Sequence, residues 1–149
     1  MTGTDIVDLA RGWIGTPYVH QASMRGAGAD CLGLLRGLWR ERFGCEPGPV
    51  PAYSADWSET ACEERLWQAL TARLPVKDIY DEAAGDVLLF RMRDGAVAKH
   101  LGLQAQVGAR ASFVHAYSGH GVLETSLSRP WQRRIVARFA FPHQRERQD

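Results

Sequence analysis

The hydrophobic positions follow a helical spacing in the first half of the chain and a strand-like spacing in the second. Near the N-terminus, Thr2 and Asp5 have the spacing of a capping box, and Gly15 and Pro17 supply a stop signal. Between these signals the apolar residues recur at intervals of three and four: Ile6, Leu9, Ala10 and Trp13. The pattern predicts a first helix that includes Trp13.

Two further helices are predicted before the hydrophobic pattern changes from a helical to a strand-like spacing. One follows a glycine-studded loop, begins at Cys31 and ends at Phe43, where Gly44 gives a C-terminal signal. Residues 45–54 contain three prolines and should be irregular, whereas residues 58–74 again show a helical register that Pro75 ends. The helix that starts at Cys31 is apolar on most sides, so we expect it to be largely buried.

Beyond Gly85 the chain breaks into short apolar runs bounded by glycine, aspartate or proline, which is typical of strands. Helices followed by an antiparallel sheet form an α+β fold. We expect one domain over residues 1–149, with a loose arginine-rich tail at 143–149. The predicted strands are 87–92, 100–107, 112–117, 121–127 and 134–141.

Charge and composition narrow the possible functions. The 149 residues carry a formal net charge of +1, which offers no electrostatic footprint for nucleic acid. The N-terminus lacks the basic start and apolar stretch of a secretory signal, and no apolar run is long enough to span a bilayer. We therefore expect synthesis in the cytoplasm without a signal peptide, no nucleic-acid partner and no membrane insertion.

Cys31 is the candidate nucleophile among three cysteines, which cannot all pair and include no C-x-x-C motif. Its place in the first turn of a helix favours the thiolate, and Asp30 before it is a suitable N-cap. A buried cysteine without chemistry is the commoner case for any single position. We assign that plain structural role to Cys45 and Cys62, which have no such placement.

A thiol nucleophile requires an imidazole base and a third group that orients it. His100 opens one predicted strand and His115 lies within the next, so the two rings can meet if the strands are antiparallel neighbours. Tyr18 could aim its phenol at the same helix terminus and stabilise an oxyanion, although ordinary packing is the simpler account. His20 is a residual candidate, and His120 lies in a turn where a solvated role is more common.

Five segments follow one another along the chain: IGTPY (14–18), ADCLGL (29–34), AAGDVLLF (83–90), KHLGL (99–103) and FVHAY (113–117). In this order they resemble the NlpC family of papain-like cell-wall cysteine peptidases. This resemblance implies a papain-like fold, with the cysteine at the N-terminus of a helix packed on an antiparallel sheet. It also implies that Cys31 is the nucleophile, His100 the base and His115 the orienting residue, with Tyr18 near the oxyanion and Asp30 in substrate binding.

The resemblance implies hydrolysis of peptidoglycan stem peptides, beside D-glutamate and diaminopimelate, with no metal or organic cofactor. The family commonly has serine after the cysteine where this chain has Leu32, which leaves the peptide specificity open. The D-C-L-G-L form resembles peptidases of phage tails and phage-like gene transfer particles. By that analogy we expect tail or baseplate partners and delivery in a particle to the periplasm or cell wall.

Three rivals to this function remain at the level of sequence. A structural tail or baseplate component could keep the fold without the chemistry. Cys31, His100 and His115 have ligand types that zinc accepts, although their spacing follows no common zinc pattern. A Cys/His acyltransferase would pass the acyl group to an acceptor other than water.

Overall fold

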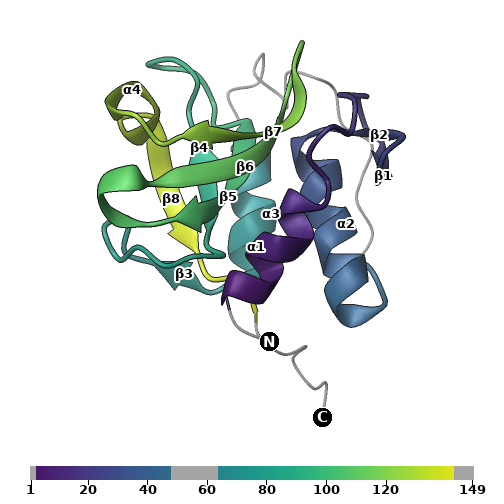
Figure 1. The fold of residues 1–149 in the computed structure, drawn as a ribbon. Coiled ribbons are helices and arrows are strands. Elements are labelled where there is room, and N and C mark those ends of the chain that lie inside the picture. The colour runs from purple at the N-terminus through teal and green to yellow at the C-terminus, as the bar shows by residue number, and fades with distance from the viewer. Residues whose placement is uncertain (1–2, 48–63, 143–149) are drawn as a thin grey trace.

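A six-stranded antiparallel sheet with helices packed against it forms the centre of the molecule, which confirms the predicted α+β class (Figure 1). The computed structural model describes residues 3–47 and 64–142. Its helices are α1 (Gly3–Arg11), α2 (Cys31–Phe43), α3 (Arg65–Arg73) and α4 (Arg129–Gln132), with a 3₁₀ turn, η2, at Gly108–Arg110. Its strands are β1 (Ser23–Met24), β2 (Gly28–Ala29), β3 (Val76–Lys77), β4 (Val87–Phe90), β5 (His100–Gln106), β6 (Ser112–Tyr117), β7 (Gly121–Ser126) and β8 (Ile135–Phe139).

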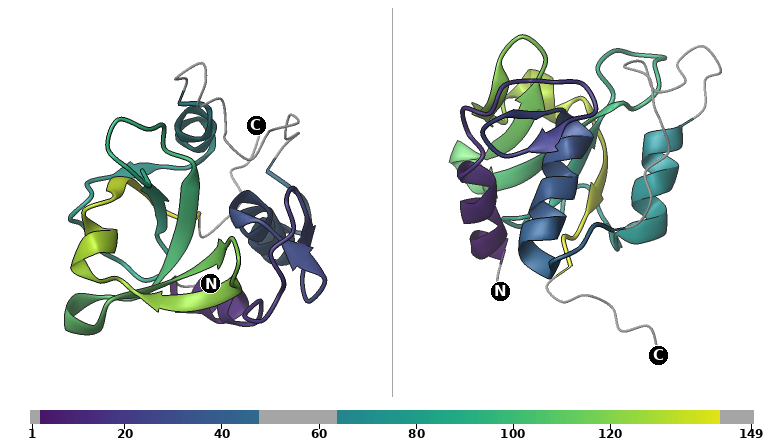
Figure 2. Two further views of the ribbon diagram at one scale, coloured as in Figure 1. Left: turned by 90° about the horizontal axis from the view of Figure 1, so that it is seen from above. Right: turned by 90° about the vertical axis from the view of Figure 1, so that its right-hand side faces the viewer.

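The large sheet has the strand order β3-β8-β4-β5-β6-β7, and its paired strands are antiparallel. Strand β8, near the C-terminus, therefore lies between β3 and β4. Viewed from above, the sheet curls, with α1, α2 and α3 on one side and α4 on the other (Figure 2). The β1–β2 hairpin forms a separate two-stranded sheet.

The two faces of the sheet bury different hydrophobic clusters because successive strand residues point to opposite sides. On β4, Val87 and Leu89 join the larger core under α1 and α2, whereas Leu88 and Phe90 join a smaller cluster on the other face. Trp131 on α4 packs against that smaller cluster. The sheet is thus covered on both faces, which explains its nearly continuous burial.

The position of α2 is set by its cap and by close approach of its glycines. Asp30 is the N-cap, as predicted: its Oδ1 accepts a hydrogen bond from Gly33 N at 2.7 Å. A Cβ at Gly37 would collide with the ring of Trp13, and one at Gly33 would collide with the Ala22 carbonyl. These two glycines allow α2 to pack closely enough to hold Cys31 at the sheet.

Several predicted boundaries differ from the structure. Helix α1 ends at Arg11, not beyond Trp13, because Trp13 N and Ile14 N bond carbonyls three residues back and tighten the last turn. Trp13 is nevertheless buried in the core. The third predicted helix is observed over Arg65–Arg73, and its expected start at 58–63, including Cys62, lies outside the described residues, as do Thr2 and the tail 143–149.

Five short elements were not predicted. The glycine-studded loop contains β1 and β2, and residues after Pro75 form β3 at the edge of the sheet. The 3₁₀ turn at Gly108–Arg110 and the one-turn helix α4 complete this group. Each has two to four residues, too few to show a hydrophobic period.

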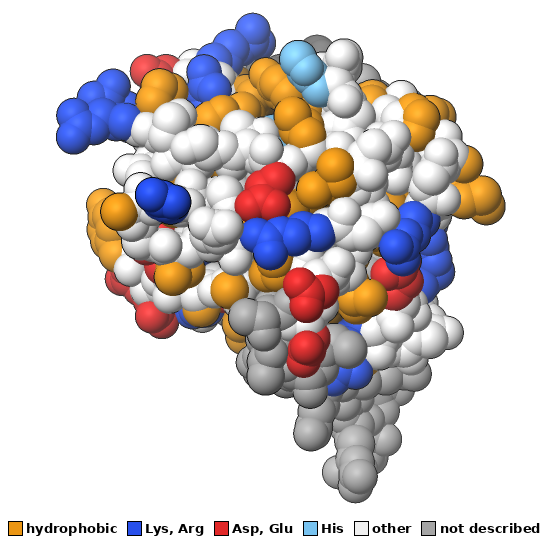
Figure 3. Space-filling model, in the orientation of Figure 1, with side chains coloured by type: hydrophobic (Ala, Val, Ile, Leu, Met, Phe, Trp, Pro, Cys, Tyr) orange, Lys and Arg blue, Asp and Glu red, His pale blue; other side chains and the backbone are white. Residues whose placement is uncertain are grey.

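Opposite charges alternate over the surface. At the centre of the face in Figure 3, acidic and basic side chains lie side by side, while hydrophobic side chains gather near its upper edge beside a histidine. One such pair is Arg11 with Glu124, at 2.8 Å between Nε and Oε1. Cys31 and Cys45 are free thiols. None of the helices in the described parts of the chain is long and apolar enough to cross a bilayer.

Candidate active site

A cleft of about 130 Å³ opens where the N-terminus of α2 meets the ends of β5 and β6. It brings together four of the five residues named from the sequence, Tyr18, Asp30, Cys31 and His100. The fifth, His115, contacts His100 from the neighbouring strand. His20, Met92, Lys99, Ala116, Tyr117 and Ser118 complete the lining.

Cys31 is the first residue of α2 and is 6% exposed, on the wall of this cleft. Its Sγ lies 3.8 Å from the carbonyl oxygen of Lys99, to which the thiol donates a hydrogen bond. Burial, followed by the negative charge of Asp30, raises the pKa of Cys31 to about 12, although the N–H groups of Leu101, Leu32 and Cys31 itself oppose that rise. At rest, desolvation therefore outweighs the helix terminus, which by itself favours the thiolate.

The two predicted histidines meet across β5 and β6. His100 Nε2 and His115 Nδ1 are 2.7 Å apart, and His115 Nε2 lies 2.8 Å from Thr125 Oγ1 on β7. These strands are antiparallel neighbours, as the prediction required. Among the described residues His100 Nδ1 forms no hydrogen bond, and the resting thiol is bonded to Lys99 and not to this ring.

This chain of hydrogen bonds is compatible with one set of tautomers that leaves a base in the cleft. If His115 donates its Nε2–H to Thr125, its Nδ1 is an acceptor. His100 must then donate Nε2–H to that acceptor, so its own lone pair is on Nδ1. Neutral His100 in this form can accept the proton of Cys31 once substrate displaces the thiol from the Lys99 carbonyl.

Aromatic residues enclose the histidine pair. The ring centroid of Trp131 lies 5.9 Å from that of His100 and 5.3 Å from that of His115. Burial, with a smaller effect of His115, lowers the pKa of His100 to about 3; burial and His120 lower that of His115 to about 4. Both imidazoles are therefore neutral at neutral pH, as a general base must be.

Asp30 and Tyr18 also line the cleft. Asp30 is 2% exposed, and its Oδ2 accepts a hydrogen bond from Gln21 N at 2.7 Å and lies 3.7 Å from His20 Nδ1. Since Oδ1 caps α2, this carboxylate holds the helix terminus as well as facing the cleft. Burial, then the charges of Cys31 and Asp30, raises the pKa of Tyr18 to about 12, so its phenol stays a donor. His120 is exposed and stacks on Tyr117.

Three contributors to the site were missed from the sequence. Thr125 Oγ1 lies 2.8 Å from His115 Nε2 and is the acceptor in the tautomer scheme above. Gly102 lies between the two histidines on the same face of the sheet, and a Cβ there would come within 3.2 Å of His115 Cβ and 2.8 Å of the Phe113 ring. Trp131 covers both imidazoles. The His-x-Gly spacing was a visible signal, but the roles of Thr125 and Trp131 depend on strand register and on a turn.

The zinc arrangement considered from the sequence has no support in this geometry. His100 Nε2 and His115 Nδ1 point at each other and share a hydrogen bond, so they do not converge on a common point with Cys31. Within residues 3–47 and 64–142 no group of three His, Cys, Asp or Glu side chains could hold a metal ion.

Similar proteins and structures carry names that describe peptidoglycan hydrolases. No family sequence model matches the chain. The murein DD-endopeptidase MepS/murein LD-carboxypeptidase of Escherichia coli strain K12 is 26% identical over 130 residues, 87% of this chain, which spans 57% of that relative's length. Proteins of the same name from two other Escherichia coli strains match equally.

Solved structures agree in fold at lower identity. The NlpC/p60 domain of the peptidoglycan hydrolase SagA superposes with a TM-score of 0.66 at 20% identity, covering 95% of this chain and 100% of that one. An NLP/P60 lipoprotein-like protein of Staphylococcus aureus gives 0.62 at 20% identity, covering 93% and 40%. An NlpC/P60 protein of Bacillus cereus gives 0.63 at 14% identity, covering 93% and 39%. The chain therefore has the papain-like fold of NlpC/P60 domains, as the order of its motifs predicted.

Proposed function

We propose that this protein is a cysteine endopeptidase that hydrolyses peptide bonds in the stem peptides of peptidoglycan. The observation that carries the proposal is the chain of contacts from the cleft inward: Cys31 at the start of α2, His100 beside it, and His115 and Thr125 behind His100. A nucleophile, a base and two orienting groups in this order are what acyl transfer requires. The names of the relatives indicate the substrate class.

The reaction begins when substrate enters the cleft and Cys31 gives its proton to His100 Nδ1. The sulfur attacks the amide carbonyl, and the tetrahedral oxyanion receives hydrogen bonds from the Cys31 N–H at the helix terminus and from the phenol of Tyr18. His100 then protonates the leaving amine, which leaves a thioester on Cys31. Water, deprotonated by His100, hydrolyses the thioester and regenerates the free thiol.

Because Cys31 and His100 are both neutral at rest, the thiol proton moves to His100 while the sulfur attacks the amide carbonyl. Because the pKa of Cys31 is raised and that of His100 is lowered, the two groups do not form a thiolate–imidazolium pair before substrate binds. Stabilisation of the developing charges is thus reserved for the transition state, where it lowers the barrier.

More than one bond is a candidate for cleavage. The family resemblance points to the D-glutamyl–diaminopimelate bond within one stem. The Escherichia coli relative is named for DD-endopeptidase and LD-carboxypeptidase activities, which act on other bonds. Leu32 follows the cysteine in this chain, so the peptide end held near Asp30 is where the two specificities would differ.

We further propose that a phage tail or a phage-like gene transfer particle carries the enzyme to the cell wall, where it acts in the periplasm. The support is the D-C-L-G-L form of the cysteine motif. Mass spectrometry of purified particles tests this: peptides of the chain at a fixed ratio to tail subunits are expected, and their absence from particles contradicts it.

Mass spectrometry of peptidoglycan and of soluble stem peptides tests the activity. The wild-type protein should release new fragments whose masses identify the bond, and Cys31→Ala should release none. Cys45→Ala is the matched control, because Cys45 is also a free thiol but lies outside the cleft. A folded, reduced wild-type protein that releases no fragment would instead support a structural tail component, and transfer to an added amine in place of hydrolysis would support an acyltransferase.

A further inference from the structure

A second, larger cavity lies on the far face of the sheet from α2. It measures about 350 Å³, which is within the usual size of a small-molecule site. It shares none of its lining residues with the cleft of Cys31. The lining residues are Ile79, Tyr80, Glu82, Gly108, Leu127, Gln132, Ile135 and Arg138.

A buried arginine forms the polar side of this cavity, and one of its nitrogen donors has no acceptor among the described residues. Arg138 on β8 is 1% exposed; its Nε donates to the Ile79 carbonyl at 3.0 Å, and its Nη1 donates to Asp86 at 2.9 Å and to Gln104. Nη2 forms no hydrogen bond to a described residue, although it is not sealed from solvent. A buried guanidinium normally uses its donors, so this one is available to a ligand in the cavity.

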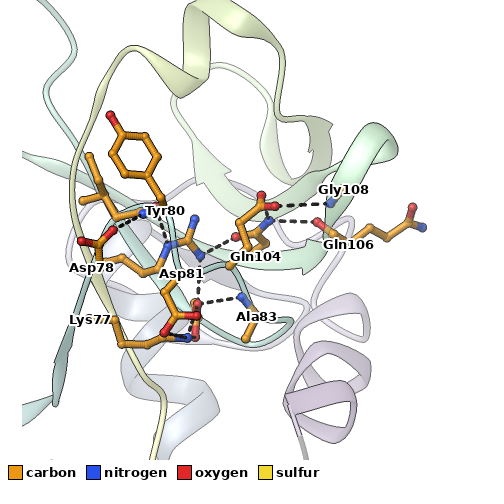
Figure 4. Close-up of polar contacts among 12 residues, drawn as sticks. Lys77, Asp78, Tyr80, Asp81, Ala83, Gln104, Gln106 and Gly108 are labelled. Carbon is orange, nitrogen blue, oxygen red and sulfur yellow. Dashed lines mark hydrogen bonds and ion pairs between the residues drawn. The ribbon is translucent and has the colours of Figure 1, made fainter.

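The charge of Arg138 is already balanced. Asp86 accepts hydrogen bonds from Arg138, from Lys77 Nζ at 2.9 Å and from Ala83 N at 3.0 Å, as the network in Figure 4 shows. Glu82 on the rim accepts from Gln104 Nε2 at 2.9 Å and adds a negative charge. An anionic ligand would gain little from this environment, whereas a neutral ligand with hydroxyl groups can accept from Nη2 and donate to Glu82.

Apolar and aromatic surface completes the site. Leu127, Ile135 and Ile79 form apolar walls. Tyr80 is 86% exposed, and in Figure 4 its ring stands clear of the polar network. Such an exposed ring offers a flat, rigid contact surface at low entropic cost. A pyranose ring presents an apolar C–H face to such a surface and hydroxyl groups at its edges.

We propose that this cavity binds a neutral sugar unit, with Tyr80 against the face of the ring and Arg138 Nη2 donating to a hydroxyl oxygen. The source of the sugar rests on the proposed function: the glycan strand to which stem peptides are attached carries such rings. Binding here would hold the enzyme on the wall while the separate Cys31 cleft acts on the peptide.

The test uses probes without stem peptides, so binding is measured independently of cleavage. Chitotetraose and peptide-free glycan strands are titrated into the ¹⁵N-labelled full chain, and amide shifts are followed by NMR. We expect shifts at residues 79–82, 108, 127, 132 and 138. Tyr80→Ala should weaken binding about tenfold or more, from loss of an aromatic contact. Met24→Ala, also highly exposed but in neither cavity, is the control.

The outcomes separate the two proposals. Arg138→Lys keeps the positive charge beside Asp86 but removes Nη2, so a variant with an unchanged melting temperature should still lose binding. Peptidase activity of Tyr80→Ala on soluble stem peptides should equal that of the wild type. A wild-type protein that binds the sugar but cleaves no stem peptide would contradict only the proposed function. Three results would overturn the sugar site. These are no amide shifts on addition of the sugar, the same shifts when acetate replaces the sugar, or an affinity of Tyr80→Ala equal to that of the wild type.

Discussion

At the scale of single residues, the site depends on which nitrogen of each imidazole carries its proton. Cys31 and His100 line one cleft, but the resting thiol donates to Lys99 and both groups are neutral. The orientation and tautomer of the His100 ring are therefore set by the residues on its far side from the cleft, where His115 and Thr125 complete the chain of hydrogen bonds. Thr125 is a positioning residue in this scheme, since it touches neither the thiol nor the cleft.

Replacing Thr125 with valine should lower kcat about tenfold with little change in KM, because the loss of one hydrogen bond worth about 1.4 kcal/mol lets His115 adopt the other tautomer. His100 would then lack an acceptor for its Nε2–H. Steady-state kinetics measures the rate, and ¹⁵N NMR of the imidazoles measures the tautomer. Thr125→Ser keeps the hydroxyl and should restore both. Equal kcat and unchanged imidazole signals in Thr125→Val would contradict the role of Thr125.

What the sequence could predict at this scale follows from how local each signal is. Asp30 and Cys31 are adjacent and their helix start is read from neighbouring residues, so the cap was predicted correctly. The contact of His100 with His115 was predicted on the condition that their strands pair, and they do. Thr125 is placed by the register of a third strand, which no local pattern specifies.

At the scale of elements, a buried ionic cluster fastens the edge of the sheet. Asp86 precedes β4 and binds Arg138 on β8 and Lys77 on β3, while Gln104 on β5 bonds the same Arg138. Four strands are therefore connected through side chains that are nearly inaccessible at Arg138 and Asp86. In a low-dielectric interior such a cluster is sensitive to loss of any one charge.

Replacing Asp86 with asparagine should lower the free energy of unfolding by about 3–5 kcal/mol, because Arg138 and Lys77 lose the carboxylate that compensates their buried charges. Urea denaturation followed by circular dichroism measures the change. Asp81→Asn is the matched control: its side chain is 72% exposed and lies 3.9 Å from Lys77, so a change of about 0.5 kcal/mol or less is expected. Equal effects of the two substitutions would show that the cluster does not stabilise the edge.

The elements themselves were predictable where they are long. Strand β6 was predicted with its observed bounds, and α2 was predicted from Cys31 to Phe43. By contrast, β3 has two residues and α4 has four, so neither shows a period. Both form because the sheet provides partners: β3 pairs with β8, and α4 is held by packing of Trp131 on the aromatic cluster. Tertiary contacts, absent from a local pattern, decide such elements.

At the scale of the whole molecule, folding buries two neutral imidazoles on the face of the sheet that carries the smaller hydrophobic cluster. His115 is fully inaccessible and His100 is 8% exposed, so protonation of either would place a charge among aromatic rings. In the unfolded chain both histidines titrate near pH 6.5, whereas folding lowers their pKa to about 3 and about 4. The free energy of unfolding is thereby linked to pH.

The sign of this linkage predicts loss of stability in mild acid. Well above pH 6.5 the histidines are neutral in both states and contribute no pH dependence. As the pH falls through 6.5 the unfolded state binds more protons, so stability falls with pH until the lowered pKa values are reached. Each histidine contributes a slope of up to about 1.4 kcal/mol per pH unit. Between pH 5 and 6.5, urea denaturation of the wild type should show close to twice the slope of His115→Gln. Identical slopes would mean that the folded protein protonates His115 as readily as the unfolded chain does, and would remove the basis for a neutral His115 that orients His100.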